Sequence, residues 1–127
     1  METEPRLMYR ENRESVILTL FGSSPKTRIL DLFLDNPLFE FTRNEIIEAL
    51  GMAKSTLYGT LPGLEEARVI VETRQIGKAS LYRLNSESLV VQDLRGLIRR
   101  YAKTIAQNET ANDSTAFEEE KRRALLA

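Results

Sequence analysis

The stretch TRNEIIEALGMAKSTLYGTLPGLEEARVIVETRQIGKASLYRL, residues 42–84, decides the fold of this chain. Its first part shows a helical apolar stripe that begins at a capping threonine and ends at a glycine, and a second helical pattern follows at once. Its last part has apolar residues that alternate around a turn, which is typical of a β-hairpin. The order helix, tight turn, helix and hairpin predicts a mainly helical α+β domain.

The first helix of this stretch is marked at both ends. Thr42 is its predicted N-cap, and Glu45 completes a capping box three residues later. Gly51 supplies the positive φ angle that ends the helix, and Met52 is the apolar plug of the turn. Between these signals lies the stripe that we expect to be buried, which consists of Ile46, Ile47 and Leu50.

The second helix, over about residues 53–67, is the predicted recognition helix. Its spacing of i, i+4 and i+7 turns Leu57, Leu61 and Leu64 toward the core. Pro62 lies inside it and is expected to bend it, because proline lacks a backbone donor and displaces the carbonyl four residues earlier. Its polar and cationic start presents Lys54, Ser55, Thr56, Tyr58 and Thr60.

The hairpin is expected over residues 71–84, with Arg74 to Lys78 as its turn. Alternation predicts that one set of side chains points inward, and that Leu81 faces the other side of the sheet. Arg74 and Lys78 are expected to contact phosphate, with the alternative that they are solvated charges that keep an edge from aggregating. The inward set is Val69, Val71, Tyr82 and Leu84.

The residues before this stretch complete the predicted domain, over residues 16–85. The run Val16 to Phe21 is apolar and β-branched, and periodicity leaves it open between a strand and a buried helical turn. Ser24 as N-cap and Pro25 at the first helical position predict a helix from Pro25 to Asp35. Leu38 to Phe41 is expected to form a small strand, and residues 1–15 a flexible arm.

A long helical pattern follows over residues 87–107. Its apolar residues recur at heptad spacing, so they suit either dimerisation or packing on their own domain. We favour a dimerisation helix, because a domain of ~60 to 70 residues already closes its own core. The tail at 108–127 is polar, with only a marginal helix expected or none. The predicted dimerisation residues are Val91, Leu94, Ile98, Tyr101 and Ile105.

The charge composition of the sequence limits the kinds of partner that we expect. The chain of 127 residues has a net charge of −1, so its total charge does not indicate a nucleic-acid partner. The distribution does: between Ala49 and Leu64 the only charge is Lys54, and the hairpin tip carries cations without acids. The surface predicted to face phosphates is therefore locally cationic.

Cysteine and histidine are both absent from the sequence. Their absence excludes disulfides, thiolate nucleophiles, histidine-based triads and ordinary zinc or haem sites, so we expect neither an enzyme nor a metal or other cofactor. No apolar run reaches the roughly 18 residues that span a bilayer, and the first residues lack a secretory signal, so we expect a cytoplasmic protein with no membrane partner.

The segment LGMAKSTLYGTLPGLEEARVI, residues 50–70, resembles the helix-turn-helix of bacterial and archaeal winged-helix regulators of the MarR and ArsR kind. Residues 21–84 resemble their archaeal members in particular. The most specific parts are the turn at Gly51, the helix start at Lys54, the helix end at residues 64–67 and the wing end at Leu84. Arg68 departs from the pattern, because the family usually has glycine where the helix closes. The resemblance implies a winged helix-turn-helix with a long C-terminal helix.

The resemblance also implies a homodimeric transcriptional regulator that binds double-stranded DNA in a sequence-specific way. The recognition helix would enter the major groove and the wing would contact backbone or minor groove. The main alternative is a winged helix used as a protein–protein interaction module of a transcription or assembly complex. A third is a sensor, which without cysteine and histidine is limited to organic effectors. The expected DNA-binding residues are Thr42, Arg43, Lys54, Ser55, Thr56, Tyr58, Thr60, Arg74 and Lys78.

Overall fold

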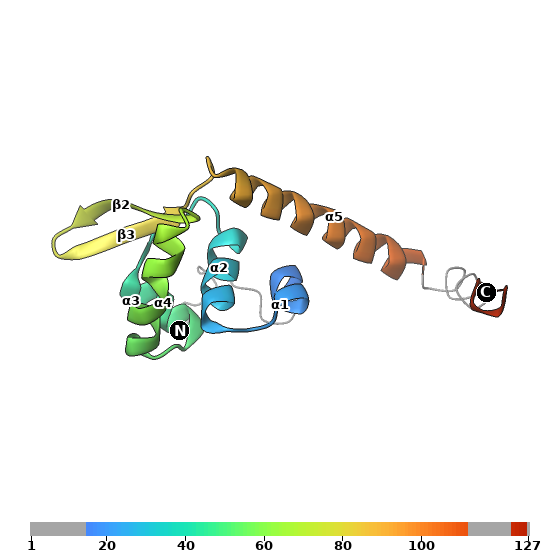
Figure 1. Ribbon diagram of the computed structural model, residues 1–127, viewed down its shortest axis with the longest axis horizontal. Coiled ribbons are helices and arrows are strands. Elements are labelled where there is room, and N and C mark those ends of the chain that lie inside the picture. Colours follow the sequence, from blue (N-terminus) through green and yellow to red (C-terminus); the bar gives the residue numbers. More distant parts are fainter. Residues whose placement is uncertain (1–14, 112–122, 127) are drawn as a thin grey trace. The chain divides into compact units, whose positions relative to one another are not determined.

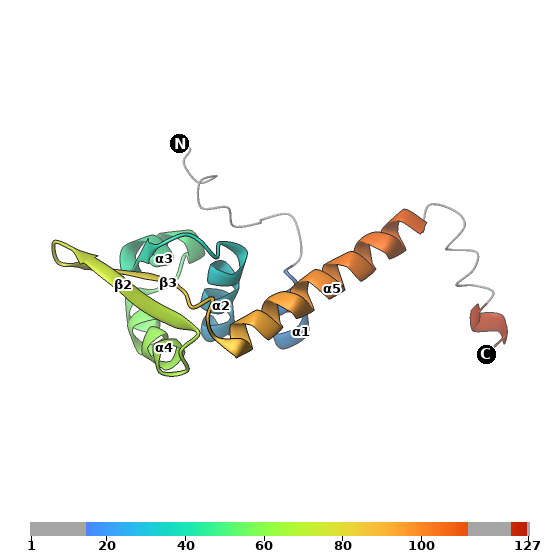
Figure 2. The same ribbon diagram turned by 90° about the horizontal axis from the view of Figure 1, so that it is seen from above.

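The computed structural model describes residues 15–111 and 123–126. They fall into two units, one ending at Arg95 and one beginning at Gly96, and each is described by itself. The predicted arm at 1–14 and the tail at 112–122 and 127 lie outside the described residues. In chain order the elements are α1 (Val16–Phe21), α2 (Pro25–Asp35), β1 (Phe41–Thr42), α3 (Arg43–Leu50), α4 (Lys54–Glu66), β2 (Ile70–Ile76), β3 (Ala79–Leu84) and α5 (Leu89–Ala111) (Figures 1 and 2).

The run that the sequence left open, Val16 to Phe21, is the helix α1. Ser15 caps it by accepting a hydrogen bond from the Leu18 amide at 3.2 Å, and its hydroxyl donates to the Asp31 carboxylate at 2.5 Å. Ser15 is buried by these contacts. This residue therefore belongs to the folded unit, although the sequence placed it in the arm.

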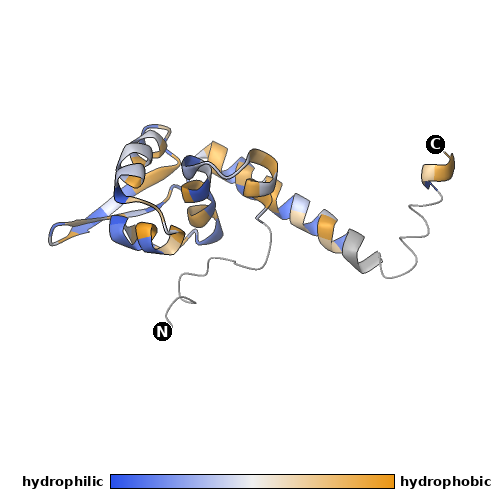
Figure 3. Cartoon of the chain, turned by 90° about the horizontal axis from the view of Figure 1, so that it is seen from below, coloured by the Kyte–Doolittle hydropathy of each residue, from blue (hydrophilic) through white to orange (hydrophobic). Residues whose placement is uncertain are grey.

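The helix α2 has the predicted bounds, with Ser24 as N-cap and Pro25 in its first turn. Its residues Ile29, Leu32 and Phe33 are fully buried. It packs on α1, α3 and α4, so it forms the centre of the helical layer. Figure 3 shows apolar positions gathered where these helices face one another, whereas the hairpin is mainly hydrophilic.

The capping box at the start of α3 is confirmed. The Thr42 amide donates to Glu45 Oε1 at 2.8 Å, and the Glu45 amide donates to Thr42 Oγ1 at 3.1 Å. Gly51 ends the helix with φ 61°, as expected. Ile46 and Leu50 are buried, whereas Ile47 is only half-buried.

The helix α4 confirms the predicted inward set, because Leu57, Leu61 and Leu64 are all buried. Pro62 lies inside the helix, which continues beyond it to Glu66. Prolines are tolerated within a helix when the rest of the helix is held by packing, and the leucines on either side of Pro62 supply that packing here.

The sheet is antiparallel with the strand order β1-β3-β2. The small strand expected at Leu38 to Phe41 was placed too early, since β1 contains only Phe41 and Thr42. The chain still turns before that point, where the Phe39 amide donates to the Asn36 carbonyl at 3.1 Å, and Leu38 is 83% exposed. Extended pairing therefore begins only at Phe41, whose ring packs edge-on against Phe33 at 5.2 Å between centroids.

The expected turn of the hairpin was too long. Only Gly77 and Lys78 connect the strands, because Arg74, Gln75 and Ile76 pair with residues of β3. Gly77 has φ 62°, which glycine adopts readily at the first central position of a two-residue turn.

The inward assignment of Val71 was wrong. Ile70 pairs with Leu84 and is fully buried, whereas Val71 pairs with Arg83 on the other face and is half-buried. The cause is that Val69 is not a strand residue, because its amide donates to the Leu64 carbonyl at the end of α4. The alternation begins one residue later than the sequence suggested.

The long helix predicted near the C-terminus is confirmed as α5, which extends to Ala111. Val91, in its first turns, is fully buried within its own chain and so contributes to the core. Leu94, Ile98 and Tyr101 are half-buried, and Ile105 is 37% exposed. Residues 123–126 form one helical turn.

The end of α4 contains a residue in a costly conformation. Arg68 has φ 65°, and it alone among the described residues other than glycine has a positive φ. Its amide donates to the Glu65 carbonyl and the Val69 amide donates to the Leu64 carbonyl, which is the Schellman arrangement that favours glycine at this position. The Asn85 side chain also donates to the Arg68 carbonyl at 2.8 Å and holds the corner in place.

We predict that Arg68→Gly raises the free energy of unfolding by about 0.5–1 kcal/mol, because it removes the Cβ that makes the left-handed conformation unfavourable. Urea unfolding followed by circular dichroism measures the change. Arg68→Ala is the control, since it removes the charge and keeps the Cβ. Equal stabilisation by both variants would show that backbone strain is not the cause.

Candidate nucleic-acid interface

The start of α4 offers polar side chains and free backbone donors to solvent. Lys54, Ser55 and Tyr58 are exposed, and Thr56 is half-buried. Ala53 is the N-cap and supplies no side-chain hydrogen bond, so the first amides of the helix keep their capacity to bind an anion. Thr60 is half-buried, and its hydroxyl donates to the Thr56 carbonyl at 2.7 Å.

Arg43, in the first turn of α3, links three elements of the fold. Its guanidinium carbon lies 5.2 Å from the ring centroid of Tyr58 on α4 and 5.2 Å from that of Tyr82 on β3. Lys54 Nζ lies 5.6 Å from the centroid of the same Tyr58 ring. All three distances are within the range of cation–π attraction. The exposed Tyr58 ring therefore holds cations from two helices close to each other.

Tyr82 does not neutralise Arg43. Burial raises the pKa of the Tyr82 hydroxyl above its ordinary value, and the positive charge of Arg43 opposes that rise without cancelling it. The phenol is therefore uncharged at neutral pH. Among the described residues, no carboxylate forms an ion pair with Arg43, so its full charge is available to a ligand.

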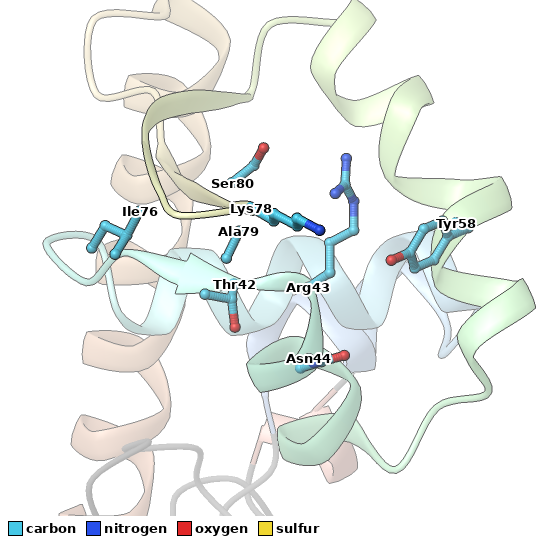
Figure 4. Close-up of a pocket in the computed structure, with 8 residues that line it drawn as sticks. All are labelled: Thr42, Arg43, Asn44, Tyr58, Ile76, Lys78, Ala79 and Ser80. Carbon is cyan, nitrogen blue, oxygen red and sulfur yellow. The ribbon is translucent and has the colours of Figure 1, made fainter.

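A hollow of about 370 Å³ opens between the start of α3, the middle of α4 and the tip of the hairpin (Figure 4). The side chains of Arg43 and Lys78 extend into the space between the hairpin and α4, and Tyr58 faces this space from α4. Two cations and several hydroxyl groups are suited to hydrogen bonding with phosphate oxygens. The lining residues are Thr42, Arg43, Asn44, Tyr58, Ile76, Lys78, Ala79 and Ser80.

The structure brings part of the predicted site together at this hollow. Thr42, Arg43, Tyr58 and Lys78 line it, and Lys54 joins them through the Tyr58 ring. The other lining residues were not predicted from the sequence. Their only local signal was their position beside the capped helix start and the hairpin turn; the hollow itself depends on contacts between distant parts of the chain. The missed residues are Asn44, Ile76, Ala79 and Ser80.

Arg74 lies in a different environment from the other predicted cations. Its Nε and Nη2 atoms are each 3.0 Å from Oε1 of Glu40, in the segment before β1. The hairpin tip is free of acids in the sequence, because Glu40 is 34 residues away along the chain. Folding brings this carboxylate to the hairpin, and the charge of Arg74 is already paired.

The described residues 15–111 and 123–126 include no helix that is both long and apolar enough to cross a membrane. Within the same ranges, no group of three or more acidic, histidine or cysteine side chains is placed to hold a metal ion.

Comparison with known proteins identifies the fold. No protein-family model matches the sequence, and no curated protein sequence matches it. Among solved structures, the chain is similar to MepR, a transcription regulator of the Staphylococcus aureus multidrug efflux pump MepA, with a TM-score of 0.58 and 14% identity over 97% of this chain and 84% of that one. It is also similar to M. tuberculosis Rv0081, with a TM-score of 0.51 and 20% identity over 75% of this chain and 90% of that one. The predicted α+β architecture is thereby confirmed, and the chain has the winged-helix fold that is found in transcription regulators.

Proposed function

We propose that this protein is a transcriptional regulator that binds double-stranded DNA in a sequence-specific way and acts as a homodimer, without enzymatic activity. The observation that carries the proposal is the cluster of Arg43, Lys54 and Lys78 around Tyr58, beside the uncapped start of α4. The resemblance of the fold to MepR, a transcription regulator, supports it.

In this proposal α4 enters the major groove. Lys54, Ser55, Thr56 and Tyr58, with Thr60 further along, face base edges or the nearest phosphates. Thr42 and Arg43 hold the DNA backbone from α3, and the hairpin contacts backbone or minor groove through Lys78. Arg74 belongs to the same surface, although its charge is shared with Glu40. Phosphate contacts of this kind fix the orientation of the protein on DNA and carry no sequence information.

The part of α5 that begins at Leu94 is proposed as the dimerisation helix. Leu94, Ile98, Tyr101 and Ile105 retain exposed surface, in contrast to Val91, which is fully buried in its own chain. The seam that a partner would cover therefore begins at Leu94. In a two-fold dimer bound to duplex DNA, the two recognition helices would lie about 34 Å apart to reach successive major grooves.

We predict that binding to a mixed-sequence duplex weakens steeply between about 50 and 200 mM salt, and that Arg43→Ala and Lys54→Ala each lower the salt slope by about 0.9, the value of one phosphate contact. Fluorescence anisotropy with a labelled duplex measures both quantities. The matched control is Lys26→Ala, which removes an exposed cation at the start of α2 and should leave the slope unchanged.

Absent or salt-independent binding would contradict the DNA-binding proposal and favour a protein–protein interaction module. An equal effect of all three substitutions would also contradict it, because net charge rather than a defined surface would then control the affinity.

We predict that Ile98→Glu shifts the protein from dimer to monomer, because an unpaired charge is costly in an apolar seam. Sedimentation velocity over a range of protein concentrations measures the change. Lys103→Glu, on an exposed position of the same helix, is the control and should remain dimeric. A dimer that persists in Ile98→Glu would exclude this seam.

A further inference from the structure

The ion pair between Glu40 and Arg74 joins two residues that lie 34 positions apart in the sequence. Both Nε and Nη2 of Arg74 lie 3.0 Å from a single carboxylate oxygen. The Arg74 side chain is 62% exposed and that of Glu40 is 23% exposed. Exposed ion pairs contribute little to stability, so the fold does not depend on this one.

A β-bulge directs Arg74 toward Glu40. The pairing register shifts between Glu72, which pairs with Tyr82, and Arg74, which pairs with Leu81. In an unbroken ladder Arg74 would pair with Ser80 and point to the opposite face, because side chains alternate along a strand. Bulges commonly redirect a side chain in this way.

The other partner is placed by β1. Thr42 pairs with Leu81 from the opposite side of β3, so Thr42 and Arg74 lie on the same face of the sheet. Glu40 precedes Thr42 by two residues, the interval at which an extended chain returns to one face. The buried ring of Phe41 fixes the backbone between them. The carboxylate is thus held beside the hairpin.

Glu40 keeps its negative charge in this position. Burial would raise its pKa, but the hydrogen bonds from Arg74 and Thr73 and the positive charges of Arg74 and Arg83 outweigh burial and bring the pKa below its ordinary value. Of the cations proposed to face DNA, which are Arg43, Lys54, Arg74 and Lys78, Arg74 is the one with a carboxylate partner among the described residues.

We infer that Glu40 is a negative determinant of DNA affinity: it withholds Arg74 from the phosphate backbone and keeps binding through the hairpin weak. The inference rests on the proposed DNA-binding function. A phosphate that approaches Arg74 must compete with a carboxylate already in contact with two of its three donor nitrogens, and it meets the repulsion of that carboxylate as well. Non-specific binding, which depends mainly on phosphate contacts, is the binding mode most affected.

The test is Glu40→Gln, which keeps the size of the side chain and removes its charge. A fluorescein-labelled, mixed-sequence duplex of about 30 base pairs serves as the probe, long enough for two recognition helices one turn apart. We expect the affinity of the variant to rise about three- to tenfold and its salt slope to steepen by about 0.9 to 1.8, the value of one to two phosphate contacts. In the Glu40→Gln background, Arg74→Ala should abolish the gain.

Glu66→Gln is the matched control. It makes the same change of charge at the last residue of α4, whereas Lys54 is the first. The substitution should leave the DNA affinity and the salt slope unchanged. An unchanged affinity in Glu40→Gln, with wild-type protein still binding the duplex, would overturn this inference and leave the proposed function standing. A gain that persists after Arg74→Ala would also overturn it, because Arg74 would then not be the group released. Failure of every variant to bind would overturn both.

Discussion

The arrangement of the proposed interface depends on a strand of two residues. Phe41 and Thr42 pair with Tyr82 and Leu81, and Thr42 is at the same time the N-cap of α3. The hairpin and α3 are therefore joined through one residue, Thr42, which is fixed by its pairing with Leu81 and by a reciprocal capping interaction with Glu45. Because Arg43 follows Thr42 directly, the same joint determines where its guanidinium meets Tyr58 and Tyr82.

This joint brings together side chains that are far apart in the sequence. α3 contributes Arg43, α4 contributes Lys54 and Tyr58, and the hairpin turn contributes Lys78. The segment before β1 adds the opposing charge of Glu40. The surface is thus a balance of three available cations and one paired cation, which the nearly neutral total charge of the chain does not reveal.

The signals that correctly predicted the fold from the sequence act over three or four residues. The capping box of Thr42 and Glu45, the cap at Ser24 and the left-handed Gly51 are such signals, since they depend on neighbouring backbone groups. The errors arose where contacts outside these signals decide the outcome. Val69 is drawn into the end of α4 and shifts the alternation of the hairpin, and the pairing of Arg74 depends on a bulge and on Glu40. The contact between Glu40 and Arg74 spans 34 residues, and no local pattern encodes it.

The pair of aromatic rings around Arg43 gives the protein an internal optical reporter. The sequence contains four tyrosines and no tryptophan, so tyrosine alone accounts for the intrinsic fluorescence of the chain. Two of these tyrosines, Tyr58 and Tyr82, flank the guanidinium of Arg43. Tyr58 is 46% exposed and borders the hollow, while Tyr82 is buried behind the same cation. Occupation of the hollow therefore alters the surroundings of an emitting group directly, and unlabelled protein suffices to follow it.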